Sequence, residues 1–355
     1  MDNNIKRHKI KLPQIILLVI LIVGTIYVAR ENNKGGSVEN TKVWSQNKVQ
    51  KNTGSIFGTI YHITYEHSAN LSDSIEARLK EVDNSLSPFN PESNISAINN
   101  NSTVVPDERM LHVFNLAKDI SGKTDGAFDI TVAPLVNLWG FGFANESEVD
   151  ASKVDSIMEF VGINKINYSD GKLIKSDERV MLDCSAIAKG FGVDEIGKFL
   201  ESKGIANYMV EIGGEVRTKG YNLNGVRWRI GINKPDDDAL SVNNEIEQVI
   251  ELTDMSVATS GNYRNFYIKD NKKYAHTIDP RTGYPVQHNI LSSTVLATDC
   301  STADAYATAF MVLGLEASQK VLETNPEVKA YFIYSIDSVN IGVWYSPSLK
   351  NIIKK

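Results

Sequence analysis

Two short segments near the C-terminal end of the chain carry the residue types best suited to chemistry. The first, His276–Pro285 (HTIDPRTGYP), places an imidazole just before a turn rich in proline and glycine. The second, Ala303–Thr308 (ADAYAT), places the Asp304 carboxylate and the Thr308 hydroxyl four residues apart, on one face of an expected helix. An imidazole can accept a proton from an attacking hydroxyl, and hard oxygen ligands can hold Mg²⁺. Together the two segments predict metal-assisted phosphoryl chemistry.

Each segment also has an ordinary structural explanation. An aspartate early in a helix complements the helix dipole, and a threonine can form a hydrogen bond back within the helix. The spacing alone therefore favours a structural role over metal binding for Asp304 and Thr308. A lone histidine is usually structural or exposed. His276 stands out from the other five histidines because a turn, Asp279–Gly283, follows closely and would hold it rigidly. The residues alone leave both alternatives open.

Two further segments combine polar groups with small or aromatic neighbours. In Asp183–Gly190 (DCSAIAKG) an expected strand leads into a helix of small residues, so that a phosphate can approach the backbone and Lys189 can reach it. The alternative is a plain strand–helix turn with an exposed lysine. In Thr124–Leu135 (TDGAFDITVAPL) Phe128 can stack on a planar ring while Asp129 accepts hydrogen bonds from it, and a strand and a proline are expected to follow Asp129. The alternative is a hydrophobic turn with a capping aspartate.

Two glycine-rich pieces, Glu211–Glu215 and Ala258–Arg264, follow expected strands. Neither is a GxGxxG segment that opens a helix, and neither has the Lys-Ser/Thr ending of a P-loop, so a Rossmann site is not supported. Tight turns are the expected structure of both, and the second piece, rich in hydroxyls, is the better candidate for ligand contact.

Hydrophobic periodicity predicts the elements that must position these residues. Helices are expected over 73–86, 108–124, 150–161, 188–203, 303–313 and 315–324. Strands are expected over 58–65, 172–175, 180–183, 208–212, 228–232, 248–252, 256–260, 292–297, 330–334 and 341–345. The strands come in hairpin-like runs rather than in βαβ alternation, which favours an α+β fold with a largely antiparallel sheet. No composition break divides residues 53–350, so one domain is expected there.

The N-terminal segment has the pattern of a membrane signal. The 355-residue chain has a formal charge of −6, but residues 1–30 hold five basic residues and one acid, which leaves −10 on the remainder. A basic tail (1–11) precedes an uncharged, mostly aliphatic run (12–29), and a polar linker (30–52) follows. This pattern favours an uncleaved single-pass anchor with the body outside the cell membrane; a cleaved signal peptide is the alternative. An acidic body argues against nucleic-acid binding.

The two cysteines, Cys184 and Cys300, exclude a disulfide scaffold and a cysteine-rich zinc site. Each flanks one of the segments above. Two free, buried thiols are the favoured interpretation, although a disulfide is the alternative in an oxidising location.

Taken together, the segments resemble the ApbE family, the FAD:protein FMN transferases. The resemblance runs from Phe57-Gly58-Thr59 to the helix with Asp304 and Thr308, and it also includes Ser87–Ser96 (SPFNPESNIS) and Val210–Gly214 (VEIGG). It implies a single ApbE-like domain that splits FAD at its pyrophosphate, joins FMN to a threonine hydroxyl of an acceptor flavoprotein and releases AMP. The acceptors it implies are membrane electron-transfer complexes and extracytosolic flavoproteins.

The resemblance also implies roles for individual residues. Mg²⁺ would be held by Asp304 and Thr308, with a main-chain contribution near Ala186. FAD would be contacted by Phe57, Phe89, Ala127, Phe128, Asp129, Asp183, Lys189 and Ile278. The family often has Met at the position of Phe57 and Tyr at that of Phe89, and both are ring-packing positions. His276 is the expected base, because a threonine hydroxyl has too high a pKa to attack unaided. Two other functions stay open: a Mg²⁺-dependent FAD pyrophosphatase with water as acceptor, and a flavin-binding protein without activity.

Overall fold

The computed structural model describes residues 48–354, except 103–104, 143–148, 236–245, 263–265, 270–271 and 338–339. The expected tail (1–11) and anchor (12–29) and most of the linker (30–52) lie outside the described residues. Within the described part, no helix is long and apolar enough to cross a membrane.

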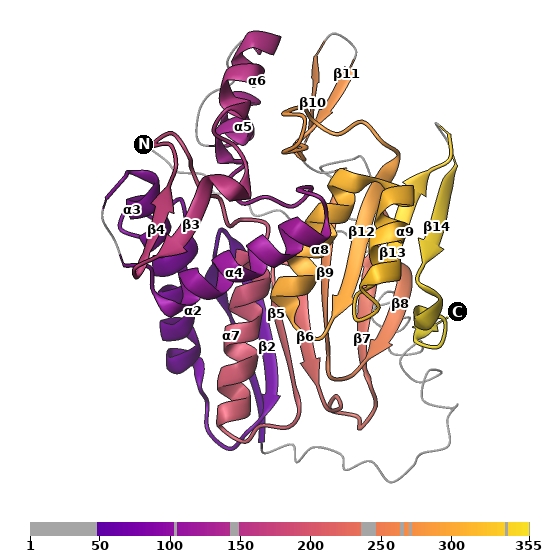
Figure 1. The fold of residues 1–355 in the computed structure, drawn as a ribbon. Helices are drawn as coiled ribbons and strands as arrows, with labels where there is room; N and C mark the ends of the chain where they lie inside the picture. The colour runs from indigo at the N-terminus through magenta and orange to yellow at the C-terminus, as the bar shows by residue number, and fades with distance from the viewer. Residues whose placement is uncertain are drawn as a thin grey trace, which may run out of the picture. The chain divides into compact units, whose positions relative to one another are not determined.

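An eight-stranded sheet forms the centre of the domain, with the order β1-β2-β5-β6-β9-β12-β13-β14 (Figure 1). Every neighbouring pair is antiparallel, which confirms the expected fold class. The strands are β1 (Val49–Ile56), β2 (Thr59–Glu66), β5 (Tyr208–Ile212), β6 (Glu215–Lys219), β9 (Met255–Gly261), β12 (Ile290–Ala297), β13 (Lys329–Ser335) and β14 (Ile341–Tyr345).

Helices cover one face of this sheet (Figure 1). They are α2 (Ser72–Leu86), α4 (Glu108–Lys123), α7 (Ala188–Ser202), α8 (Cys300–Leu313) and α9 (Leu315–Thr324), and shorter helices are α3 (Asn94–Asn99), α5 (Ala133–Leu138) and α6 (Ala151–Met158). Alternate residues of β2, Tyr61, Ile63 and Tyr65, are buried and pack in one apolar cluster with α7. This period of two is what directs one face of a strand to a core.

A small sheet packs against the opposite face. Its strands are β7 (Trp228–Asn233), β8 (Ile246–Leu252) and β15 (Ile353–Lys354), in the order β15-β8-β7. Ile250 and Leu252 of β8 form an apolar cluster with Val257 of β9, Leu296 of β12 and Ile333 of β13. The central strands are therefore covered on both sides, and this explains why nearly every residue of β12 is buried. Two hairpins, β3 (Ile166–Ser169) with β4 (Lys172–Lys175) and β10 (Phe266–Lys269) with β11 (Lys272–Ala275), complete the described strands.

Three local predictions were wrong. Residues 180–183 are not a strand, because the Asn99 side chain bonds both the N–H and the C=O of Leu182, at 2.7 and 2.9 Å, and takes the place of a partner strand. The strand expected after Asp129 is instead a turn followed by α5, with Pro134 in the first turn, where a missing N–H costs nothing. Strand β1 begins at Val49, inside the segment predicted as linker.

Cys184 and Cys300 are buried and free, as expected.

Helices α7 and α8 approach closely at Gly190. A Cβ added there would lie 2.4 Å from the Cys300 carbonyl oxygen and 2.8 Å from Cβ of Asp304. The contact atoms are mostly backbone, so they cannot turn away as a flexible side chain would. Only a glycine therefore permits this spacing of the two helices.

We predict that Gly190→Ala destabilises the protein by about 1–3 kcal/mol, the usual cost of forcing an extra carbon into a packed interior. Gly122→Ala in α4 is the matched control, because no atom of the described residues lies within 4 Å of an added Cβ. The helical alanine there should stabilise by roughly 0.5–1 kcal/mol. Urea unfolding of both variants measures the difference. Equal stability of the two variants would show that the helices can separate without cost.

Candidate active site

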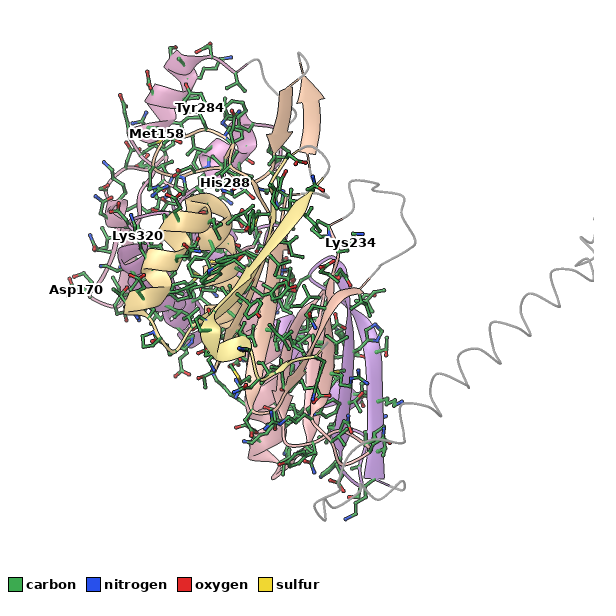
Figure 2. All side chains as sticks on the ribbon, turned by 90° about the vertical axis from the view of Figure 1, so that its right-hand side faces the viewer. Met158, Asp170, Lys234, Tyr284, His288 and Lys320 are labelled. Atoms are coloured by element: carbon green, nitrogen blue, oxygen red, sulfur yellow. The ribbon has the colours of Figure 1, made fainter. Side chains whose placement is uncertain are left out.

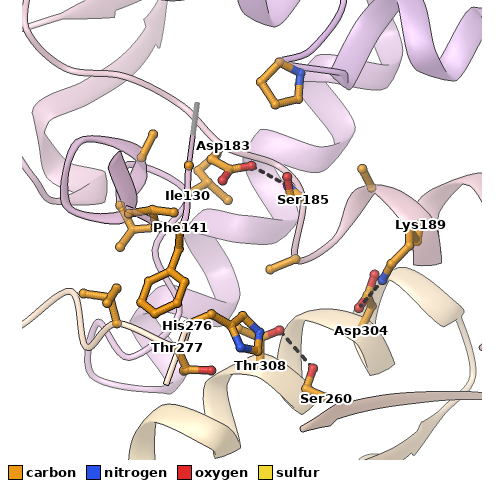
Figure 3. Close-up of a pocket in the computed structure, with 18 of the residues that line it drawn as sticks. Ile130, Phe141, Asp183, Ser185, Lys189, Ser260, His276, Thr277, Asp304 and Thr308 are labelled. Atoms are coloured by element: carbon orange, nitrogen blue, oxygen red, sulfur yellow. Dashed lines mark hydrogen bonds and ion pairs between the residues drawn. The ribbon is translucent and has the colours of Figure 1, made fainter. Parts of the chain in front are cut away.

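One large cavity, of about 1280 Å³, opens beside α7 and α8 (Figure 3). All of the site residues predicted from the sequence line it: Phe57, Phe89, Ala127, Phe128, Asp129, Asp183, Ala186, Lys189, His276, Ile278, Asp304 and Thr308. These residues come from segments far apart in the sequence, and the fold brings them together. The role of each remains a prediction.

Asp304 and Thr308 lie on the same side of α8, as predicted, and face the cavity. The cap is Asp299, whose side chain accepts a hydrogen bond from the Thr302 N–H at 2.9 Å. Asp304 is 3% exposed, and its Oδ2 accepts a hydrogen bond from the Gly190 N–H at 3.0 Å. The Thr308 hydroxyl lies 3.2 Å from that of Ser260, in the hydroxyl-rich segment that ends β9. One carboxylate oxygen, Oδ1, thus remains directed to Lys189, at 3.9 Å.

A buried acid, Asp194 of α7, holds the first turn of α8 in place. Asp194 Oδ1 accepts from the Cys300 N–H at 2.9 Å, and Oδ2 accepts from the N–H and the hydroxyl of Ser301, both at 2.8 Å. Arg217 of β6 donates to Oδ1 at 2.7 Å and balances the charge. Breaking a buried pair by removal of one partner costs about 3–5 kcal/mol, because the other charge stays buried. The helix that carries Asp304 and Thr308 is therefore fixed from its first turn.

Lys189 lies between two acids. Its Nζ donates to Oε1 of Glu215 at 2.7 Å and stands 3.9 Å from Oδ1 of Asp304. Burial on its own lowers the pKa of Lys189, but the attraction of both carboxylates outweighs this and raises the pKa. Burial raises the pKa of the Glu215 and Asp304 carboxyls, and the charge of Lys189 opposes that shift. The lysine is a protonated cation at neutral pH, suited to binding an anion.

Sequence reasoning missed Glu215 and Asp194. Glu215 falls in a segment that the sequence marks as a tight turn, and Gly213 and Gly214 there have φ of 63° and 105°. The local sequence shows only an acid directly after a turn, at the start of a strand. Its role as an ion-pair partner becomes visible only when the fold places Lys189 opposite it. In the sequence, Asp194 is indistinguishable from an ordinary polar residue of an amphipathic helix.

The Asp125–Val132 loop forms another wall. Asp129 Oδ1 accepts from the N–H and hydroxyl of Thr131, at 2.7 and 2.6 Å, and Oδ2 accepts from the Ile163 N–H at 2.6 Å. Burial raises the pKa of Asp129, and these hydrogen bonds oppose the shift. Phe128 is 2% exposed and belongs to the main core cluster, whereas Phe89 is 74% exposed at the cavity rim. Of these two aromatic residues, Phe89 is thus the more accessible from the cavity.

Hydrogen bonds close the turn that the sequence predicted after His276. Asp279 N–H donates to the Tyr284 carbonyl at 2.9 Å, and Gly283 N–H donates to the Asp279 carbonyl at 2.8 Å. Gly283 has φ of 81°, and Trp139 Nε1 donates to its carbonyl at 2.8 Å, which ties the turn to the region of α5 and α6. Figure 2 shows Tyr284 and Met158 at that end of the domain. The His276 ring lies edge-on to Phe141, with centroids 6.4 Å apart.

The donor set in this cavity suits one hard cation. Asp304 offers a carboxylate and Thr308 a hydroxyl, and the Ala186 backbone lines the same cavity. In the part of the chain that the structure describes, no three His, Cys, Asp or Glu side chains gather into a metal cluster. A cation bound here would have few protein ligands and would retain water or ligand oxygens, which is the coordination that Mg²⁺ prefers.

Comparison with known proteins agrees with this geometry. The model of the ApbE family matches residues 57–332. The FAD:protein FMN transferase of Vibrio cholerae is 41% identical over 316 residues, which span 85% of this chain and 92% of that protein. The one from Haemophilus influenzae is 38% identical over 90% of this chain and 94% of its own.

Solved structures show the same likeness. The flavin transferase ApbE of Vibrio cholerae superposes with a TM-score of 0.77 at 36% identity, over 86% of this chain and 99% of that one. The flavinyl transferase ApbE of Pseudomonas stutzeri in its apo form has a TM-score of 0.77 at 30% identity, over 87% and 98% of the two chains. The chain belongs to the ApbE family.

Proposed function

We propose that the protein is a FAD:protein FMN transferase. It splits FAD at the pyrophosphate, joins FMN through a phosphoester bond to a threonine hydroxyl of an acceptor flavoprotein, and releases AMP. The observation that carries the proposal is the meeting of Lys189, His276, Asp304 and Thr308 in one cavity. At about 1280 Å³ this cavity exceeds the ~300–1,000 Å³ usual for small-ligand sites, which suits a dinucleotide and an incoming side chain.

Asp304, Thr308 and the Ala186 backbone are the residues that would hold Mg²⁺. The bound ion would neutralise the pyrophosphate and stabilise charge on the transferring phosphoryl group. The body of the protein has a net negative charge, and Lys189, which lines the cavity, supplies a local positive charge for the phosphates. The aromatic and apolar wall residues, Phe57, Phe89, Ala127, Phe128 and Ile278, together with Asp129 and Asp183, would bind the rest of FAD.

His276 is the proposed base. The proton of the attacking threonine Oγ1 passes to a ring nitrogen of His276 while a bond forms between that oxygen and the FMN phosphorus. The bond between this phosphorus and the bridging oxygen breaks, and AMP leaves with that oxygen. The rigid turn behind His276 keeps the imidazole in place during the transfer, and such positioning is a large part of catalysis.

A transfer assay separates this function from the two alternatives. The full-length protein, incubated with FAD, Mg²⁺ and an acceptor flavoprotein, should give a fluorescent, acid-stable acceptor and an equal amount of AMP. An acceptor with its motif threonine replaced by alanine is the control and should stay unlabelled, and removal of Mg²⁺ with EDTA should stop both products. Release of AMP and FMN without labelled acceptor would identify a FAD pyrophosphatase. Intact FAD would leave a flavin-binding protein.

We predict that His276→Ala lowers the transfer rate about 10²- to 10⁴-fold, the usual contribution of a positioned base, and leaves FAD binding intact. Single-turnover kinetics and a FAD-binding titration measure the two effects separately. His62→Ala is the control, because His62 is exposed on β2 and does not line the cavity. A His276→Ala enzyme that transfers FMN at the wild-type rate would remove His276 from the role of base.

We further propose that residues 12–29 anchor the protein in the cell membrane, with the catalytic domain outside. The support is the basic tail and uncharged run of the sequence. Full-length protein should sediment with membranes, and a variant without residues 1–30 should remain soluble and active. Recovery of the full-length chain as a shortened soluble form would instead favour a cleaved signal peptide.

A further inference from the structure

Glu215 is a buried acid that the proposed reaction does not use. It is the first residue of β6 and only 3% exposed, and it lines the cavity. Its Oε1 accepts the hydrogen bond from Lys189 at 2.7 Å. Its Oε2 is buried and has no hydrogen-bond partner among the described residues. A buried carboxylate with a free oxygen is costly, so its presence calls for a function.

Lys189 divides its attraction unequally between the two acids. It makes a hydrogen-bonded ion pair with Glu215, at 2.7 Å, whereas Asp304 lies at 3.9 Å, beyond hydrogen-bond distance. Among the described residues these two acids are the ion-pair partners of Lys189. The ammonium of Lys189 is therefore held by Glu215, and Asp304 Oδ1 receives no hydrogen bond from it.

A lysine ammonium and a metal ion compete for the same carboxylate oxygens. If Lys189 moved the short distance to Asp304, a cation would have to displace it before binding. The hydrogen bond to Glu215 opposes that movement. Strand β6 holds Glu215 in this position. Glu215 and Arg217 are two residues apart and point to the same face of the strand, and Arg217 is fixed by its ion pair with Asp194.

We propose that Glu215 is a positioning residue that holds Lys189 away from Asp304 and so keeps the Asp304 carboxylate available to a divalent cation. This inference rests on the proposed cation site. In Glu215→Gln the side-chain volume is retained and the charge is lost. The attraction of Lys189 for Asp304 is then uncompensated, and Lys189 pairs with the metal ligand.

Manganese binding to the full-length protein, followed by the EPR signal of free Mn²⁺, tests this without any need for turnover. Glu215→Gln should raise the dissociation constant for Mn²⁺ roughly tenfold, within the range measured for coupled neighbouring charges. Lys189→Met should bind Mn²⁺ at least as tightly as the wild type. In the Lys189→Met background, Glu215→Gln should have a smaller effect, because no ammonium remains to compete and only the direct attraction of the Glu215 charge for the cation is lost. An equal loss of affinity in both backgrounds would overturn the proposal.

Glu211→Gln is the matched control. Glu211 belongs to the same hairpin, and its Oε1 accepts a hydrogen bond from the Gly214 N–H at 2.8 Å, but it does not line the cavity. Its variant should bind Mn²⁺ like the wild type. If Glu215→Gln does not fold, Glu215→Asp serves in the same comparison, because it keeps the charge but draws the carboxylate back from Lys189. No Mn²⁺ binding by the wild type would overturn the cation site and this inference with it, whereas equal binding by wild type and Glu215→Gln would overturn the inference alone.

Discussion

The buried ion pair of Asp194 and Arg217 is the interaction on which the rest of the site depends. Asp194 caps a helix to which it does not belong: it bonds two main-chain N–H groups and one hydroxyl in the first turn of α8. Unpaired, a carboxylate at this depth would cost several kcal/mol, and Arg217 is what permits it. Because Asp194 is part of α7, this pair joins two helices and one strand at the point from which Asp304 and Thr308 extend.

The close approach of α7 and α8 has a second consequence. Gly190 lets the helix backbones meet, and its N–H then reaches Asp304 Oδ2 at 3.0 Å. Lys189, the preceding residue on α7, reaches toward Asp304 from the same turn. One helix therefore supplies a hydrogen bond and a positive charge to a carboxylate on the other. A wider spacing between the helices would lose both contacts at once. The close approach of α7 and α8 is therefore needed both for the packing of the helices and for the contacts of Asp304.

The sequence predicted elements with a strong internal pattern and missed those whose partners lie elsewhere. Helix α9 and strand β14 were predicted to the residue, because their apolar spacing and flanking residues are local signals. Strand β1 is polar (VQKNTGSI) and exists because β2 offers it a hydrogen-bonding edge. Residues 180–183 look like a strand but bond the side chain of Asn99, and no local pattern reveals that exchange.

The same distinction applies to the site. Residues that belong to a recognisable sequence segment, such as His276 and Asp304, were predicted to lie together, and they line the same cavity. Glu215 and Asp194 were missed because each has meaning only opposite a partner: Lys189 for the one and Arg217 for the other. Both partnerships join α7 to β6, where residues 215 and 217 point to the same face of the sheet. Strand β6 thus supplies an ion-pair partner for two buried charges of α7. Arg217 pairs with Asp194, which holds the first turn of α8, and Glu215 pairs with Lys189, which lies beside Asp304. A displacement of β6 would therefore disturb the contacts of Asp194 with the first turn of α8 and the contacts of Lys189 beside Asp304 together.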